Sequence, residues 1–509
     1  METFFIENFG CRATEADATA IRQALSGKGL VHSVNPALAD VVVLNTCTVT
    51  AAADSQARDA VRKIHRANPA ARIILTGCYA QRAPEELAAL DGVAYVVGNG
   101  RQNEIPGLVE RGAGAGKPMA AERSSDFVPV SQLATQLATH QQERPTDATL
   151  PLAHGLAKVL TSDIFARATV QLAPASLMAG GHTRPILKIQ DGCNNRCSYC
   201  VIPFVRGSSR SLSPDIVVEE VRALVSAGAR EIVLSGINLG SYGRDLVPRS
   251  DLPTVVRRIL DETQVEHLRF SSIEPQDVTE DFVALVASST RLAPHFHVPL
   301  QSGSDRTLKA MHRWYRSELY AERIRVVRRR LPHAAIGADV IVGFPGETGE
   351  DFQQTFHFIE GLPFTYLHVF SFSTRPGTEA SRGGGAVPAK VIRERARALR
   401  QLSDQKASAF RKLQEGRSLR ALTLARTGDG WTEALTANYL KVRVAGQYAP
   451  NEWHEIRVPR EGEPAPAAGG GSVFENHLGE REIAAVGDRQ RNLLHTEAIG
   501  ELARGAREI

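Results

Sequence analysis

Short apolar runs alternate with amphipathic stretches over the first hundred residues of the chain. The runs at 4–6, 41–44, 73–75 and 93–97 have the length of buried strands, and helical stretches follow at 15–25, 51–67 and 84–90. Short buried strands that alternate with helices are typical of a parallel, doubly wound sheet. We therefore predict an α/β domain of this kind over residues 1–110.

A second alternation of strand and helix patterns occupies residues 184–405. Its strand-like runs lie at 186–189, 232–234, 268–271, 295–299, 336–342 and 366–372. Six such β/α units indicate a partial (β/α)6 barrel, an open version of the eight-unit barrel. In that architecture the active site lies at the carboxyl ends of the strands.

The remaining segments have different compositions. Residues 406–462 alternate apolar and polar positions between glycine-containing turns, which predicts a small, basic β-barrel. Residues 111–183 are rich in small and polar residues and are expected to be a linker with an insertion, and residues 463–509 are expected to be a low-complexity tail. The chain therefore divides into three folded parts.

Composition and charge restrict the class of protein. The 509 residues are 43% hydrophobic, which is enough for several cores, and no apolar run approaches the roughly twenty residues of a membrane span. The start of the chain lacks the basic and apolar regions of a secretory signal, so a reducing cytoplasm is expected. The formal net charge is only +4, but basic residues gather near the third part, at Lys406, Arg411, Lys412, Arg417 and Arg420. Such a cluster suits a phosphate backbone, and a solvated helix face is the alternative.

Three cysteines lie within eight residues in the run DGCNNRCSYC, at Cys193, Cys197 and Cys200. A cubane iron–sulfur cluster takes four ligands, so three thiolates leave one iron open to another molecule. An open coordination position is typical of a working metal site. Zinc and a disulfide are the alternatives, but zinc prefers two cysteine pairs or a Cys/His set, and no histidine is near.

The other three cysteines, Cys11, Cys47 and Cys78, each follow an apolar run of the first domain. Ligands of doubly wound sheets bind beyond the carboxyl ends of the strands. Three positions that are distant in sequence can therefore converge on one cluster. Buried structural cysteines are the alternative interpretation.

Polar residues and glycines follow several predicted strands of the second part. Glycine lets the backbone approach a ligand closely, and polar side chains can orient it, although each position could also be an ordinary turn. The candidates for binding a small molecule at this face of the barrel are Gly236, Asn238, Glu274, Gln301 and Gly343.

Taken together, these motifs resemble those of the radical S-adenosylmethionine (SAM) methylthiotransferases, over nearly the whole chain. The resemblance implies that Cys193, Cys197 and Cys200 hold a 4Fe–4S cluster whose open iron binds SAM, and that Tyr199 is the aromatic residue that accompanies it. It also implies that Cys11, Cys47 and Cys78 hold an auxiliary 4Fe–4S cluster, and that residues 406–462 are an RNA-binding TRAM domain. The implied cofactors are thus two 4Fe–4S clusters and SAM.

Within that family the run NTCTVT at 45–50 and the run LHVFSFSTRPGTEA at 367–380 look most like one branch. Its members convert N6-threonylcarbamoyladenosine, beside the anticodon of tRNA, to the 2-methylthio derivative. The resemblance implies tRNA as the partner and an electron donor such as flavodoxin or ferredoxin, while the source of the sulfur is not implied. No catalytic side chain is expected beyond the cluster ligands, because the cofactor performs the difficult step.

The sequence also departs from the family. The family usually reads Gly-Cys-Lys-x-Asn at its first cysteine, whereas this chain has Arg12 and Thr14 there, and its linker is longer than usual. Two related functions remain as alternatives: methylthiolation of N6-isopentenyladenosine in tRNA, and of an aspartate in a ribosomal protein. An iron–sulfur protein that binds RNA without turnover is the alternative from another class.

Overall fold

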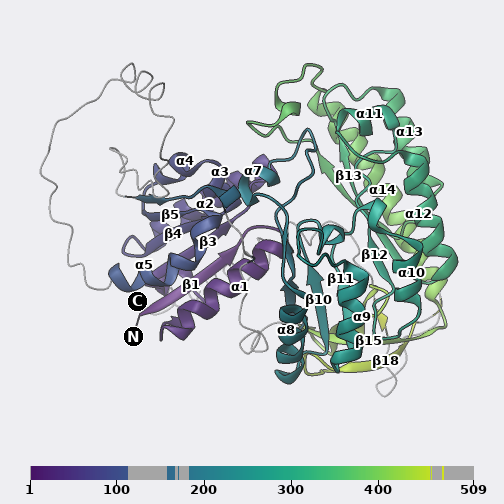
Figure 1. Ribbon diagram of the computed structural model, residues 1–509, viewed down its shortest axis with the longest axis horizontal. Helices are drawn as coiled ribbons and strands as arrows, with labels where there is room; N and C mark the ends of the chain where they lie inside the picture. The colour runs from purple at the N-terminus through teal and green to yellow at the C-terminus, as the bar shows by residue number, and fades with distance from the viewer. Residues whose placement is uncertain are drawn as a thin grey trace, which may run out of the picture.

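The computed structural model describes residues 2–112, 157–166, 170, 183–458, 460 and 473–474. Figure 1 shows three parts: a purple and blue α/β domain, a teal and green barrel beside it, and a yellow sheet below the barrel strands. This arrangement confirms the predicted α/β fold class with its three parts. Among the described helices, none is both long and apolar enough to cross a membrane.

The first domain has one sheet of six parallel strands in the order β2-β1-β3-β4-β5-β6. The strands are β1 (Thr3–Asn8), β2 (Val31–His32), β3 (Val41–Thr46), β4 (Arg72–Gly77), β5 (Val93–Val97) and β6 (Lys158–Leu160). The last of these, β6, lies within the segment 111–183 that was expected to be a linker. The sheet is therefore wider than the sequence pattern suggested.

Alternate residues of each strand pack against helices on opposite faces of this sheet, as its doubly wound order requires. Val41 and Val43 of β3 pack with α1 (Arg12–Gly27) and α5 (Ile105–Gly112). Val42 and Leu44 pack on the other face, which is covered by α2 (Ala51–Ala67), α3 (Cys78–Arg82) and α4 (Pro84–Ala88). A strand buried on both faces explains the unbroken apolar run that begins at Val41.

The barrel is built from two sheets of three parallel strands each, in the orders β11-β10-β7 and β12-β13-β14. Their joint is held by single hydrogen bonds, such as the one from the Ala293 amide to the Leu268 carbonyl at 2.8 Å. The strands are β7 (Ile186–Lys188), β10 (Glu231–Ser235), β11 (His267–Phe270), β12 (His295–His297), β13 (Ala335–Val342) and β14 (Tyr366–Ser371). All six predicted strands are present.

Helices cover the outside of the barrel (Figure 1). Several begin at a side chain that caps the first turn, for example Ser213 and Asp251, each followed within two residues by a proline. The helices are α8 (Pro214–Ser226), α9 (Leu252–Glu262), α10 (Glu280–Ala287), α11 (Asp305–Ala310), α12 (Ser317–Arg330), α13 (Gly349–Glu360) and α14 (Ala389–Gln414). Between β7 and β10 lie β8 (Gln190–Asp191), α7 (Ile202–Arg206) and β9 (Arg210–Ser211).

The third part is a curled antiparallel sheet in the order β18-β15-β16-β17-β19. Its strands are β15 (Ser418–Gly428), β16 (Trp431–Thr436), β17 (Lys441–Ala445), β18 (Trp453–Arg457) and β19 (Val473–Phe474). Ala421, Ala434, Val442 and Ile456 lie in its own small core. Because β19 falls in the expected tail, the sheet extends beyond residue 462.

Tyr439, in the turn between β16 and β17, anchors this sheet to the barrel. Its ring stacks on His295 with centroids 4.0 Å apart, and the Arg269 guanidinium lies 5.3 Å from the ring centroid. Arg269 also donates to the Thr436 carbonyl at 3.3 Å, and Arg12 donates to the Tyr439 hydroxyl at 3.5 Å. His295 is the first residue of its strand, so the sheet closes the amino end of the barrel.

Replacement of Tyr439 by alanine should detach the C-terminal sheet from the barrel. The change removes a buried aromatic ring, so we expect a loss of about 3 kcal/mol in the free energy of unfolding. Tyr439→Phe keeps the ring and is the matched control. Chemical denaturation and limited proteolysis would measure the effect, and equal stability of the two variants would contradict this role.

Candidate functional site

Cys11, Cys47 and Cys78 meet at one edge of the first sheet. Cys11 caps the amino end of α1 after β1, Cys47 follows β3, and Cys78 is the first residue of α3 after β4. The strand order reverses between β1 and β3, and ligands of doubly wound sheets bind at such a reversal. The predicted convergence of these three loops is therefore present.

The loops approach so closely that only glycine fits between them. A Cβ on Gly10 would lie 2.9 Å from the Cys47 Cβ and 3.5 Å from its Sγ. Gly77 has a φ of 96°, and a Cβ there would lie 2.3 Å from the Thr46 carbonyl oxygen. Both glycines allow the neighbouring cysteines to share one small space.

The three thiols interact electrostatically. Burial raises the pKa of the Cys47 thiol, and the neighbouring Cys78 and Cys11 raise it further. All three cysteines are free rather than joined as a disulfide. Three thiols that oppose each other's ionisation suit a cation that binds them together, so these residues fit a three-cysteine cluster.

Cys193, Cys197 and Cys200 lie in the loop between β8 and α7, beyond the carboxyl end of the first barrel strand. Gly192 begins the loop with a φ of 71°, and a Cβ there would lie 2.0 Å from the Ser208 carbonyl oxygen. Burial raises the pKa of the Cys200 thiol to about 12, with Cys197 as the next cause. The thiols of this loop are close enough to oppose one another's ionisation, and these residues also fit a three-cysteine cluster.

Arg313 binds this second cysteine triplet. Its guanidinium donates to the Cys197 Sγ at 3.3 Å and forms an ion pair with Glu274. It also donates to the Tyr315 hydroxyl at 3.2 Å. The side chain is only 5% exposed, so a buried positive charge lies directly against a candidate ligand thiol.

Four of the predicted SAM-binding residues lie around this loop. The backbone amide of Asn238 donates to the Gln190 side chain at 2.8 Å, and Gly236 lies against the same side chain. Burial raises the pKa of Cys193, and the Asn238 side chain acts in the opposite direction, which places the two residues together. The buried Asn238 Oδ1 has no hydrogen-bond partner. Tyr199 packs edge to face on Phe344, with ring centroids 6.4 Å apart.

The other two predicted residues, Gln301 and Gly343, follow strands β12 and β13 of the second barrel sheet. Gln301 has a φ of 66°, which is unusual for a residue with a side chain, and its amide donates to the Asp339 carbonyl at 2.8 Å. Gly343 donates to the Glu347 carboxylate at 2.6 Å, and a Cβ there would lie 2.5 Å from Ile392 of α14. The glycine at this strand end is therefore accounted for by helix packing.

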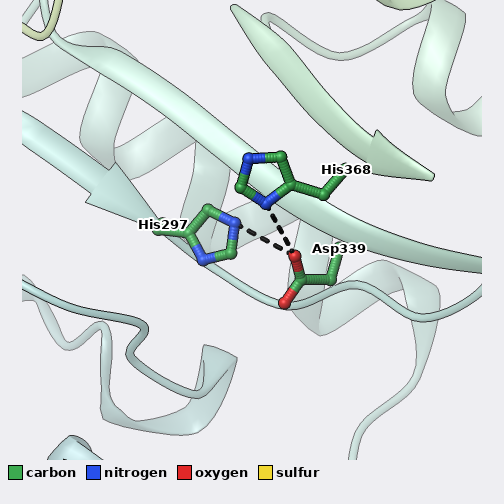
Figure 2. Close-up of side chains that lie close together, drawn as sticks. All are labelled: His297, Asp339 and His368. Carbon is green, nitrogen blue, oxygen red and sulfur yellow. Dashed lines mark hydrogen bonds and ion pairs between the residues drawn. The ribbon is translucent and has the colours of Figure 1, made fainter. Parts of the chain in front are cut away.

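Figure 2 shows a polar cluster inside the barrel that the sequence analysis did not select. His297 and His368 both point at the Asp339 Oδ1, with Nε2 and Nδ1 at 3.2 Å and 3.1 Å respectively. The other ring nitrogen of His297 pairs with the Ser272 hydroxyl at 2.8 Å. Burial acts to raise the pKa of Asp339, but the two histidines outweigh it and hold the pKa well below its ordinary value.

The donor atoms of this cluster lie within 4.8 Å of one another, which is close enough to share a divalent cation. The contacts between the side chains already stabilise the ionised carboxylate, so the cluster does not require a metal. His368 and Asp339 are partly exposed inside the barrel. The cluster therefore offers polar contacts to a molecule bound there.

Contacts around Asp54 hold the Cys47 loop against the barrel. Arg375, which follows β14, forms an ion pair with Asp54 at 2.6 Å and donates to the Thr48 carbonyl at 3.3 Å. The Thr48 hydroxyl donates to Asp54 at 2.7 Å and accepts from Arg82 at 2.7 Å. Thr48, the threonine that follows Cys47 in the NTCTVT run, thus belongs to a structural network between the domains.

Part of the basic cluster expected to face RNA serves the fold instead. The Lys406 ammonium donates to the carbonyls of Glu360 and Leu362 at 2.9 Å and 2.7 Å. Arg420 pairs with Glu266 at 2.8 Å and lies 4.2 Å from the ring centroid of Trp453. These contacts join α14 and β15 to the barrel.

Sequence reasoning did not identify Arg313, nor the cluster around Asp339. Arg313 stands in a short segment between two helices, where no local pattern marks it. A signal for the cluster was present, because His297, Asp339 and His368 are polar residues at inward positions of strands whose outward positions are apolar. Inward polar residues in a barrel are candidates for ligand contacts.

Known protein families match both α/β parts of the chain. The chain matches the Radical SAM superfamily over residues 187–359 and uncharacterized protein family UPF0004 over residues 3–98. Among solved structures, the radical S-adenosylmethionine methyltransferase TsrM from Kitasatospora setae is similar with a TM-score of 0.50 and 16% identity, over 75% of this chain and 77% of that one. That likeness concerns the fold.

Curated relatives cover most of the chain. Threonylcarbamoyladenosine tRNA methylthiotransferase MtaB of Aquifex aeolicus is 34% identical over 86% of this chain and 96% of its own length. The protein of the same name in Bacillus subtilis is 34% identical over 88% and 91%. A tRNA-2-methylthio-N(6)-dimethylallyladenosine synthase of Streptomyces viridosporus is 32% identical over 90% and 82%.

Replacement of Asp339 by asparagine should destabilise the barrel by about 2 kcal/mol, because two imidazoles lose an ionised hydrogen-bond acceptor. The folded pKa of Asp339 lies below the unfolded value, so its stabilisation is present above about pH 4 and is lost as the pH falls through the folded pKa. Denaturation curves should therefore show a difference at pH 7 that shrinks in acid. The matched control is Glu379→Gln, since Glu379 pairs with His312 at the surface. An effect of Asp339→Asn no larger than that of the control would contradict the assignment.

Proposed function

Because the chain belongs to the radical SAM methylthiotransferase family, we propose that it acts on N6-threonylcarbamoyladenosine beside the anticodon of tRNA and forms the 2-methylthio derivative. Membership follows from relatives that are 34% identical over most of both chains. The protein is accordingly a transferase of methylthio groups that uses SAM and a 4Fe–4S cluster. The choice of adenosine derivative is supported by the names of these relatives.

The observation that carries the proposal is the presence of two separate cysteine triplets, one where three loops of the first domain meet and one in a single loop of the barrel. We assign the SAM-binding 4Fe–4S cluster to Cys193, Cys197 and Cys200. We assign an auxiliary 4Fe–4S cluster to Cys11, Cys47 and Cys78, whose loops share the space that Gly10 leaves open. When bound, the first cluster supplies the electron for SAM cleavage and the second supplies the iron site that carries sulfur.

The residues of this chain then bind and orient the reactants. Tyr199, Gly236, Asn238 and Glu274 are proposed to contact SAM, since they surround the second triplet. The partnerless Asn238 Oδ1 offers SAM a buried hydrogen-bond acceptor. Arg313 holds Cys197 and Glu274 in place.

We propose that the target base enters the barrel next to the polar cluster of His297, Asp339 and His368. Gln301, which bonds the Asp339 carbonyl, lies on the same wall. Tyr439, which stacks on His295 and closes the amino end of the barrel, would help to keep water away from a reactive species. Gly343 would shape this end of the barrel through its contact with α14.

The C-terminal sheet is proposed to be a TRAM domain that binds tRNA, with domain limits close to those expected from the sequence. Arg411, Lys412 and Arg417 remain candidates for phosphate contacts, which would position the anticodon stem without reading its sequence. A cytoplasmic location and an electron donor such as flavodoxin or ferredoxin are proposed along with this substrate.

The two triplets should each bind iron independently. Anaerobically reconstituted protein should hold about eight irons, and replacement of Cys193, Cys197 and Cys200 by alanine should halve that number and abolish SAM cleavage. Replacement of Cys11, Cys47 and Cys78 should also halve the iron but leave slow SAM cleavage without methylthio product. Full iron retention in either triple variant would contradict the ligand assignment.

The substrate is tested with two tRNAs that differ in the modified adenosine. With tRNA bearing N6-threonylcarbamoyladenosine, mass spectrometry of the nucleosides should show the methylthio derivative. With tRNA bearing N6-isopentenyladenosine, no product should form. The opposite result would move the chain to the function named for its Streptomyces relative, and activity on a ribosomal protein alone would overturn the RNA substrate.

A further inference from the structure

Five charged side chains are buried together where the first domain meets the barrel. None is more than 6% exposed. They come from both sides of the interface: Asp17 of α1, Lys188 of β7, Asp191 of β8, Arg206 of α7 and Arg210 of β9. Three are positive and two are negative.

Arg206 joins the two domains directly. Its guanidinium donates to Asp17 Oδ2 at 2.8 Å and to Asp191 Oδ1 at 3.0 Å. Asp17 lies on the helix that Cys11 caps, and Asp191 lies two residues before Cys193. One planar guanidinium therefore ties together the elements that carry the first cysteine of each triplet.

The charge of Arg206 also acts on Cys78 of the first triplet. Burial raises the pKa of the Cys78 thiol, and the charge of Arg206 acts against that rise. Asn99 reinforces the contact, because its side chain donates to the Cys78 Sγ at 3.7 Å and to the carbonyl of Val205 at 2.8 Å. The carboxyl end of α7 is thus fixed against the first residue of α3.

Stability alone does not explain this network. Removing charges from water is expensive, and a buried ion pair is often no more stabilising than apolar residues of the same size. What such a network supplies is a defined geometry, since its partners are satisfied in one arrangement only. Here the arrangement so defined is the relative position of the two cysteine triplets.

We propose that Arg206 is a positioning residue for both cysteine triplets, which fixes their relative position and raises the reduction potential of the cluster held by Cys11, Cys47 and Cys78. The inference rests on the proposed function, because it assumes a cluster at each triplet. A nearby positive charge favours the reduced, more negative state of a cluster. The bridge between Asp17 and Asp191 would separately determine how well the two cysteine triplets act together.

The two roles can be separated by two substitutions. Arg206→Gln removes both the charge and the bridge, whereas Arg206→Lys keeps the charge but cannot bind two carboxylates as a fork. The matched control is Arg269→Gln, because Arg269 is equally buried on Glu231 but lies at the amino end of the barrel. Asp17→Asn breaks the bridge from the other domain without touching a cysteine.

The reduction potential is measured by electron paramagnetic resonance in full-length chains that also carry alanine at Cys193, Cys197 and Cys200, so that only the auxiliary cluster contributes. We expect Arg206→Gln to lower the potential, and Arg206→Lys and Arg269→Gln to leave it near that of the parent chain. In otherwise intact holoenzyme, the yield of methylthio product per SAM cleaved should fall several-fold in Arg206→Gln, Arg206→Lys and Asp17→Asn.

An unchanged potential and an unchanged yield in Arg206→Gln would overturn the inference, as would an equal shift of the reduction potential in Arg269→Gln. If Arg206→Gln does not fold, Arg206→Lys and Asp17→Asn decide, and an unchanged yield in both overturns the bridging role. Failure of the proposed function is seen separately. A parent chain that holds iron at only one triplet would remove the auxiliary cluster and the inference with it, whereas a wrong tRNA substrate would leave the shift in potential intact.

Discussion

The buried ion network around Arg206 is the constraint on which the arrangement of the candidate site depends. The first domain and the barrel each carry one cysteine triplet. The two triplets can act together only if the domains are held in one position. Asp17, Lys188 and Asp191 supply that position through charges that cannot be satisfied separately. The interface therefore specifies geometry more than it adds stability.

Other contacts hold the remaining parts of the candidate site in place. Arg375 and Asp54 hold the Cys47 loop against the barrel at a second point, so the domains cannot rotate about the Arg206 network alone. Arg313 performs a similar task within the barrel, where it binds Cys197 and Glu274. Tyr439 closes the opposite end and leaves the carboxyl ends of the strands for the reactants. Each cysteine loop is thus supported by a buried cation from another part of the chain.

Much of the fold could be predicted because its signals are local. Every strand of the barrel falls on a strand-like run of the sequence, and the cysteines of DGCNNRCSYC lie close enough in sequence to indicate a shared metal. The strand β6 was missed, because three residues carry too short a pattern and their partner β5 lies on the far side of an insertion. The contact of Gly343 with Ile392 could not be predicted, because a glycine that makes room for a helix has the same local pattern as one that approaches a ligand.

The sequence by itself determined the division into three parts, the parallel sheets and the two sets of thiols, because period, length and spacing are properties of neighbouring residues. Only the tertiary structure decided which charges meet. Asp17 and Arg206 are 189 residues apart, and nothing in either local segment indicates the other. The cluster of His297, Asp339 and His368 likewise exists only because three strands curve around one interior. Contacts of this kind depend on the direction in which each side chain points after the chain has closed.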